Sequence, residues 1–342
     1  MTTINIDGSL GEGGGQVLRS SLSLSMITGQ PFRIEKIRAK RAKPGLMRQH
    51  LTCVRAAAEI CGAKVEGAEL KSQELSFVPG KVKTGEYSFA VGTAGSTSLV
   101  FQTVFLPLLL ADGESIVQFE GGTHNSKAPS FDYISEVFMP VVRRMGAEAE
   151  LELVRAGFYP AGQGQFVAEI GSVDSLKPIE LLRRGGLKSR LAVAGLCNLE
   201  ERIGKRELSE LSKVLDLNLK EMNVHHYEGA AGAGNVLSMA YEFDELTEIF
   251  TGFGEKGVTA EFVAKQVAKE AARYAKEEAP VGDYLADQLL LPFALVGGGR
   301  FRTLALSQHF LTNKDIIEKF LDVEIETTRE SRLSWLVEIK TK

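Results

Sequence analysis

The sequence predicts a mixed α/β (α+β) protein built from three βαβαββ units, with a smaller α/β domain inserted into the third. Three observations support this prediction. The same order of extended and helical segments occurs twice in the first half of the chain, with a period of roughly 85 residues. The 35 glycines cluster beside apolar runs, as tight turns between strands and helices require. A chain of 342 residues is also long for one core, which favours two domains.

The first unit is expected within residues 3–78. It begins with an apolar strand and a glycine-rich turn, continues through two helical patterns separated by a strand, and ends in two short strands. The expected segments are a strand at 3–6, the glycine cluster at 11–15, a helix at 17–27, a strand at 32–37, a helix at 47–60, and strands at 64–69 and 74–78.

The second unit repeats this order, and Gly92 and Gly95 follow its first strand as the glycine cluster follows the first strand of unit one. Recurrence of one order argues for an α/β protein made of like units. The expected segments are a strand at 87–91, a helix at 97–110, a strand at 115–119, a helix at 131–145, and strands at 148–154 and 165–170.

A third, interrupted copy is expected at the end of the chain. Its expected segments are a strand at 178–182, a helix at 284–295, a strand at 302–306, a helix at 313–320, and strands at 323–327 and 333–339. The chain between them is rich in Glu and Lys and ends in a long amphipathic helix at 261–277. We therefore expect a large domain of residues 1–184 plus 278–342 and an inserted domain of residues 185–277, with hinges at Gly185-Gly186 and 278–280.

The charge balance excludes a general nucleic-acid coat. The 40 basic and 44 acidic residues leave a formal net charge of −4, so a nucleic acid would have to be held locally, at one end. Cys53, Cys61 and Cys197 form no CxxC pair and no zinc spacing, which is typical of reduced thiols in an intracellular protein. No leader pattern and no apolar run of about 18 residues is visible, so a cytoplasmic location without membrane contact is expected.

The glycine-rich segment at 7–16 is the first candidate site. A turn between a strand and a helix directs backbone N–H groups at one point, which suits an anion. The segment is no Walker A loop, and Gln16 stands where a dinucleotide fingerprint needs its third glycine. A tight packing turn is the alternative, but Glu12 within the loop favours a divalent metal site, and Arg19 is placed to face the same point.

A basic cluster follows at 33–48, with six net positive charges in sixteen residues. Such a cluster is either a local phosphate trap or a solvated charged face. Lys36 and Arg38 are expected to share one face of a strand, with Arg41 in the following loop. The arginines are the better candidates, because their forked donors suit phosphate. Gln49 and His50 follow on a helix.

The sequence alone does not show which of the remaining histidines has a catalytic role. His124 lies in an expected loop and could simply be exposed. The adjacent His225 and His226 would point to opposite sides of a strand and cannot chelate together. His309 follows an extended segment and is an ordinary catalytic candidate by itself.

The segment at 282–288 opens a helix. Asp283 is expected to cap this helix, while Asp287 lies four residues further along the same face. Tyr284 offers an aromatic plane, and Gln288 adds a polar amide. A cap needs a single acid, so Asp287 and Gln288 favour recognition of a purine base.

Five stretches together resemble the RNA 3′-terminal phosphate cyclase family. They are 11–16 with Arg19, 38–50, 157–162, 284–288, and His309. The resemblance runs in order over nearly the whole chain, and the family's fold is three βαβαββ units with an insert in the third. Two positions depart from the family pattern: Gln163 interrupts a glycine run, and His124 stands where relatives carry Asp or Asn.

The resemblance implies a three-step reaction on RNA 3′ ends. The imidazole of His309 would attack the α-phosphorus of ATP, giving a histidine–AMP phosphoramidate and pyrophosphate. The RNA 3′-phosphate would take the AMP to form RNA-(3′)pp(5′)A, and the 2′-OH would displace AMP to close a 2′,3′-cyclic phosphodiester. The need for a 2′-OH explains RNA rather than a DNA duplex as the partner.

The resemblance also implies a role for each matching residue. Glu12 would hold Mg²⁺ or Mn²⁺, and the catalytic set would be His309 with Arg19, Arg38 and Arg41. Arg38, Arg41, Gln49 and His50 would lie at the RNA end. The nucleotide would contact Gln102, Asp283, Tyr284, Leu285, Ala286, Asp287 and Gln288.

Three other classes of function compete with this one. A cyclase-like scaffold for ribosome assembly would share the fold without the activity, but His309, Glu12 and the arginines favour an enzyme. An enolpyruvyl transferase would need two full three-repeat domains and a longer chain. A plain RNA-binding module is disfavoured by the acidic balance.

Overall fold

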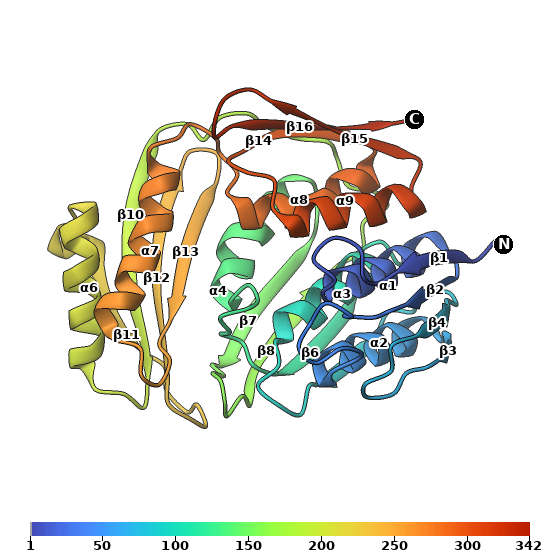
Figure 1. Ribbon diagram of the computed structural model, residues 1–342, viewed down its shortest axis with the longest axis horizontal. Helices are drawn as coiled ribbons and strands as arrows, with labels where there is room; N and C mark the ends of the chain where they lie inside the picture. Colours follow the sequence, from blue (N-terminus) through green and yellow to red (C-terminus); the bar gives the residue numbers. More distant parts are fainter. Residues whose placement is uncertain (1) are drawn as a thin grey trace.

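The computed structural model describes residues 2–342 and confirms the mixed α/β class (Figure 1). The described strands form four sheets of four strands each, and the helices pack against these sheets. The search for a membrane-spanning helix in residues 2–342 found none of sufficient length and apolarity.

Three of the sheets share one topology. Their strand orders are β1-β2-β4-β3, β5-β6-β8-β7 and β9-β14-β16-β15. In each sheet the first two strands are parallel and the other pairings are antiparallel. The strands are β1 (Ile4–Asp7), β2 (Phe32–Glu35), β3 (Lys64–Glu66), β4 (Leu75–Val78), β5 (Glu86–Ala90), β6 (Ser115–Gly121), β7 (Ala149–Arg155), β8 (Gly164–Ile170), β9 (Glu180–Leu181), β14 (Gly298–Thr303), β15 (Val323–Arg329) and β16 (Trp335–Thr341).

Helices connect these strands because a parallel pair needs a crossover rather than a tight turn. In the first two sheets α1 (Gln16–Thr28) and α3 (Thr97–Leu109) make the crossover, and α8 (Asp283–Val296) leads into β14 in the third. The second helices are α2 (Arg48–Cys61), α9 (Gln308–Phe320), and a segment made of α4 (Phe131–Tyr133), a π-helical turn (Ile134–Phe138) and α5 (Met139–Arg144).

The fourth sheet, at the left of Figure 1, has the order β11-β10-β12-β13 and lies between β9 and α8 in the chain. Its strands are β10 (Leu187–Cys197), β11 (Met222–His226), β12 (Gly234–Phe243) and β13 (Thr247–Phe253). A 3₁₀ turn (Leu219–Glu221) precedes β11, and α6 (Glu201–Leu215) and α7 (Ala260–Ala275) pack on the sheet and on each other. The division into domains at residues 184/185 and 277/278 stays a prediction.

Helix α1 lies in the main core, where it contacts α2, α3 and α9. It carries four buried serines, whose hydroxyls are all bonded within the protein. Ser23 donates to the Thr103 carbonyl of α3 at 2.7 Å, and Ser20 donates to Asn313 of α9 at 2.6 Å. These small polar side chains let the helices approach closely without leaving buried donors unsatisfied.

Four local expectations were wrong. Strand β2 ends at Glu35, so Lys36 and Arg38 lie in a turn, with φ of 54° and 55°, rather than on one face of a strand. Helix α9 begins at Gln308 instead of 313, because the Ser307 hydroxyl accepts a hydrogen bond from the Phe310 N–H at 3.0 Å and caps the helix.

The extended segment expected at 302–306 is strand β14, which ends earlier, at Thr303. The helix expected at 131–145 is likewise interrupted by the π-helical turn. The start of α9 matters most for the site, because it places His309 in the first turn of a helix.

Candidate active site

The glycine turn between β1 and α1 is where side chains from distant parts of the chain meet. A Cβ on Gly11, whose φ is +55°, would lie 1.8 Å from the Thr312 Oγ1 of α9. A Cβ on Gly15 would lie 2.5 Å from His50 Nε2 and 2.8 Å from an Arg19 nitrogen. These glycines are therefore required for close approach of α9, α2 and α1 side chains to the turn backbone.

Glu12, in the same turn, contacts His309 and Arg41. Its Oε2 lies 3.0 Å from His309 Nε2 and 2.5 Å from Arg41 Nη2. Burial alone would raise the pKa of Glu12, but the hydrogen bond and charge of His309, with the charge of Arg41, outweigh burial and lower it. The hydrogen bond with Glu12 in turn raises the pKa of His309. The side chain of His309 is 48% exposed, so a ligand can reach the ring.

Arg19, which is buried, and His50, which is half-buried, lie on the inner side of the turn. Arg19 donates to Gln16 Oε1 at 2.6 Å. Burial lowers the pKa of His50 to about 3, and the positive charges of Arg19, Arg38 and Arg41 lower it further. His50 is therefore neutral at physiological pH. Its Nδ1 is buried and has no hydrogen-bond partner among residues 2–342, which leaves it free for a ligand.

Two of the residues predicted to contact phosphate or RNA, Arg38 and Gln49, also hold the surrounding loops in place. Arg38 Nη1 donates to the carbonyls of Lys43, at 2.6 Å, and Gly45, at 2.9 Å. Gln49 Oε1 accepts from the Ser96 N–H at the start of α3, at 3.1 Å. Each keeps donors for a ligand, because a guanidinium has five N–H groups and an amide has two.

Helix α8 contributes the other side of the site. Asp287 is half-buried, its buried Oδ1 lacks a partner in the described chain, and burial raises its pKa to about 6. Gln288 Oε1 accepts from Gln102 Nε2 of α3 at 2.7 Å. A pocket of about 60 Å³ lies between α1, α3, α8 and α9, lined by Gln16, Arg19, Ser20, Ser23, Gln102, Phe105, Leu106, Phe138, Asp287, Gln288, Leu291 and Asn313.

The first turn of α8 differs from expectation. The helix is capped at Gly282, and Asp283 is its first residue and forms an ion pair with Arg273 of α7 instead of capping. Tyr284 is exposed, whereas Leu285 and Ala286 are buried in the core. A nucleotide contact by Leu285 or Ala286 would therefore have to involve the backbone.

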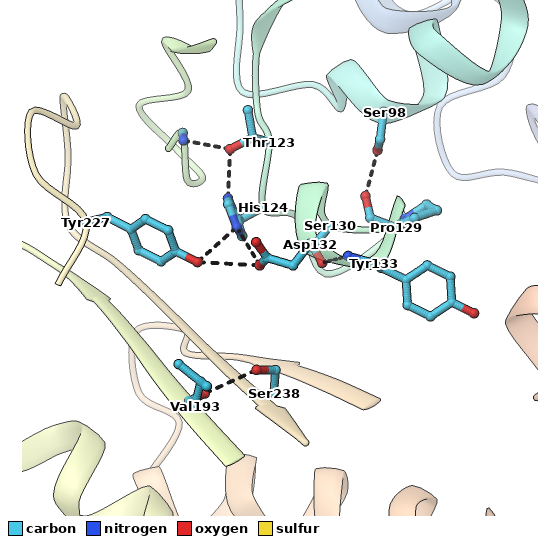
Figure 2. A network of polar contacts seen from close by, with 11 residues as sticks. Ser98, Thr123, His124, Pro129, Ser130, Asp132, Tyr133, Val193, Tyr227 and Ser238 are labelled. Atoms are coloured by element: carbon cyan, nitrogen blue, oxygen red, sulfur yellow. Dashed lines mark hydrogen bonds and ion pairs between the residues drawn. The ribbon is translucent and has the colours of Figure 1, made fainter. Parts of the chain in front are cut away.

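His124 does not join this site, and its reading as an exposed residue was wrong. It is 1% exposed and bonds Thr123 Oγ1 through Nδ1 at 2.7 Å. Its Nε2 lies 3.0 Å from Asp132 Oδ2 and 3.3 Å from the hydroxyl of Tyr227, which directly follows β11 of the fourth sheet (Figure 2). Its ring also stacks on Phe158, with centroids 5.1 Å apart. This network joins the second unit to the fourth sheet.

The sequence interpretation also missed Thr312 and Asn313. They share one face of α9 with His309, because residues three and four apart on a helix are neighbours. Asn313 accepts from Ser20 and donates to the Asp287 carbonyl at 3.0 Å, so it links α1, α9 and α8. The Ser307 cap could have revealed the earlier start of this helix.

Residues 2–342 contain no group of three or more His, Cys, Asp or Glu arranged to hold a metal ion. Glu12 is nevertheless compatible with Mg²⁺ in one respect. That ion is commonly held by one or two carboxylates together with substrate phosphates, rather than by a cage made of protein alone.

The fold and this site define an enzyme that handles phosphate groups. A glycine turn, a buried arginine and a histidine–carboxylate pair converge where two units of the fold meet. The family model described as RNA 3′-terminal phosphate cyclase matches residues 10–327, and the chain belongs to this family. The resemblance seen in the five motifs and the prediction of an enzyme are confirmed.

Relatives of known name agree with the family match. The chain is 51% identical over 330 residues to the RNA 3′-terminal phosphate cyclase of Koribacter versatilis, covering 96% of this chain and 93% of that protein. It is also 51% identical over 329 residues to that of Salmonella agona, covering 96% of this chain and 95% of that protein. A solved structure, the enolpyruvyl transferase NikO from Streptomyces tendae, aligns at 9% identity with a TM-score of 0.36, covering 98% of this chain and 48% of that one. This structural likeness is too weak to support an argument.

Proposed function

We propose that this protein converts an RNA 3′-terminal phosphate into a 2′,3′-cyclic phosphodiester at the cost of ATP, with His309 as the nucleophile. The contact of His309 with Glu12 beside Arg41, at the glycine turn, is the observation that carries the proposal. Membership of the cyclase family and the names of relatives at 51% identity support the overall reaction.

In the first step an imidazole nitrogen of His309 attacks the α-phosphorus of ATP. A P–N bond forms, the bond to the β-phosphate oxygen breaks, and pyrophosphate leaves. The attacking nitrogen must be unprotonated. Because Glu12 raises the pKa of His309, the ring has to lose its proton before it reacts, and the same hydrogen bond orients the ring.

In the second step an oxygen of the RNA 3′-phosphate attacks the AMP phosphorus and the P–N bond breaks, giving RNA-(3′)pp(5′)A. In the third step the neighbouring 2′-oxygen attacks the RNA phosphorus, releases AMP and closes the ring. All three steps concentrate negative charge, so cationic side chains have to stabilise it. Arg19, Arg38 and Arg41 fill this role, with His50 and Gln49 beside the RNA end.

The nucleotide binds along α8 and α3. The orphaned, buried Oδ1 of Asp287 and the paired amides of Gln288 and Gln102 support recognition of a purine. The exposed ring of Tyr284 offers a stacking surface, and Asp283, Leu285 and Ala286 contribute the helix start.

Glu12 would hold Mg²⁺ or Mn²⁺ together with the phosphates of the nucleotide. Such an ion neutralises charge on the phosphate oxygens when it is bound. The substrate we propose is an RNA 3′ end with a terminal phosphate, and the proposed location is the cytoplasm.

The test uses ATP labelled at the α-phosphate with Mg²⁺ or Mn²⁺. The wild-type protein should acquire acid-labile label, and His309→Ala should acquire none. His226→Ala is the matched control, because His226 is an exposed histidine of β11 in the fourth sheet, and it should label normally. A folded wild-type protein that never acquires label from ATP or GTP would favour the inactive scaffold for ribosome assembly.

A further inference from the structure

Glu248 is a buried carboxyl group that the proposed reaction leaves unused. It lies on β13 of the fourth sheet and is 1% exposed. Its Oε1 accepts a hydrogen bond from the backbone N–H of Gly282 at 2.6 Å. Gly282 is the residue that precedes α8, so a side chain of the fourth sheet is bonded to the start of the helix that carries Tyr284, Asp287 and Gln288.

This bond replaces a capping interaction that α8 cannot make for itself. In a capping box, the side chain of the third helical residue accepts a hydrogen bond from the N-cap backbone N–H. The third residue of α8 is Leu285, which has no acceptor, and the cap residue Gly282 has no side chain. Glu248 supplies the missing acceptor from another sheet. The fit is close, because a Cβ on Gly282 would lie 2.8 Å from Glu248 Oε1.

Other side chains from this part of the chain bind residues 280–283, which lead into α8. Arg273 of α7 forms an ion pair with Asp283, the first residue of α8. The Tyr274 hydroxyl donates to the Pro280 carbonyl at 2.7 Å. The guanidinium of Arg184 lies 4.9 Å from the centroid of the Tyr274 ring. Residues 280–283 are thus anchored at three points by side chains from β13 and α7.

Helix α8 leads from this anchored start to the proposed nucleotide site. Asp287 lies one turn beyond Asp283 in the same helix, so a shift of the helix start at Gly282 would move Asp287 and Gln288. Asp287 lines the pocket with Arg19, and Gln288 is bonded to Gln102 across it. The geometry of this pocket depends on where α8 begins.

We propose that Glu248 is a positioning residue for nucleotide binding: it fixes the start of α8, and through it Tyr284, Asp287 and Gln288, without touching the nucleotide. The inference rests on the proposed function and gives the fourth sheet a part in it. Burial raises the pKa of Glu248 to about 8. Whether it is protonated or ionised, the Glu248 carboxyl has an oxygen that accepts a hydrogen bond from the Gly282 N–H. The side-chain amide of a glutamine can therefore replace it.

The experiment measures the initial rate of protein labelling against the concentration of α-labelled ATP. Glu248→Ala should raise the ATP concentration at half-maximal rate by about ten-fold, which corresponds to loss of about 1.4 kcal/mol of binding. The maximal rate should stay close to wild type. Glu248→Gln, which keeps the acceptor, should restore wild-type half-saturation. Arg206→Ala is the matched control, since it removes only the exposed Arg206–Glu261 pair, at 2.9 Å, between α6 and α7.

Each outcome decides the inference. A folded Glu248→Ala with wild-type half-saturation overturns it and leaves the proposed function standing. An equal fall of maximal rate and affinity that Glu248→Gln does not rescue also overturns it, because that pattern indicates general damage. If Glu248→Ala does not fold, Arg273→Ala is measured instead, because Arg273 holds the first residue of the same helix. A rise of about three-fold in the ATP concentration at half-maximal rate would support the inference, and no change would count against it. A wild-type protein that takes no label removes both proposals.

Discussion

His309 Nε2 lies 3.0 Å from Glu12 Oε2, although the two residues come from opposite ends of the chain. Each shifts the other's pKa: that of His309 is raised and that of Glu12 is lowered. The pair therefore favours a charged imidazolium beside a carboxylate. A nucleophilic imidazole has to be neutral, so this contact links the pH dependence of the proposed first step to Glu12.

Replacing Glu12 by Gln should lower the pKa of His309, because the carboxylate charge that stabilises the imidazolium is removed. The neutral fraction of His309 then rises at any pH near its titration. An NMR titration of the His309 ring measures this directly and needs no activity. Glu261→Gln, far from His309 in an exposed pair with Arg206, is the control. An unchanged His309 pKa in Glu12→Gln would contradict the pairing.

Replacing Gly11 by Ala should destabilise the protein by about 2 kcal/mol or more, through backbone strain and a clash. The φ of Gly11 is +55°, and the added Cβ would meet Thr312 Oγ1 at 1.8 Å. Gly29→Ala separates the two causes, because Gly29 has φ +70° with open space around it. It should cost only about 1 kcal/mol. Urea unfolding measures the free energy of unfolding of both variants. Equal decreases would mean that Thr312 of α9 does not pack closely against the glycine turn.

Replacing His50 by Gln should make the protein less sensitive to acid. The folded-state pKa of His50 is about 3 and its ordinary value is 6.5, so the unfolded chain binds the extra proton between these values. Stability is therefore lost as pH falls below 6.5, by about 3 kcal/mol at pH 4.5, and the variant escapes this loss. Unfolding free energies of both proteins at pH 7 and 4.5 test it. Parallel losses would rule out a half-buried, neutral His50.

Replacing Tyr227 by Phe should cost about 1 kcal/mol, because its hydroxyl contacts both His124 and Asp132 in the network of Figure 2. These contacts are 3.3 and 3.4 Å long, so the loss should not be larger. Tyr159→Phe is the control, since Tyr159 is 79% exposed and should change stability little. Thermal unfolding compares the two. A neutral Tyr227→Phe would show that the hydroxyl does not join the fourth sheet to the second unit.

The mixed α/β class was predictable because it depends on local patterns that recur. The order of strands, glycine turns and helices is written in the sequence within short windows, and three described sheets share one strand order. The bounds of strands and helices were predicted wrongly where the local sequence pattern is ambiguous. Nothing in the basic run at 33–48 marks the point at which β2 stops, and positive φ at Lys36 and Arg38 is unusual for residues with a Cβ.

The candidate site was predictable only as a set of motifs. The resemblance named His309 and Glu12, yet neither residue stands out by itself, and no spacing rule joins positions so far apart. The prediction for His124 failed for the same reason: its burial depends on Asp132, Phe158 and Tyr227, and Tyr227 comes from the segment after β11, about 100 residues further along the chain.

By itself, the sequence determined the fold class, the family and the residue types that can do the chemistry, because periodicity and motif order are properties of neighbouring positions. Only the tertiary structure decided which of these residues meet. It placed Glu12 against His309, left His50 neutral and half-buried, and set Glu248 at the start of α8. Such contacts join segments from different sheets, and they exist only when helices and sheets pack together and remove the side chains from water.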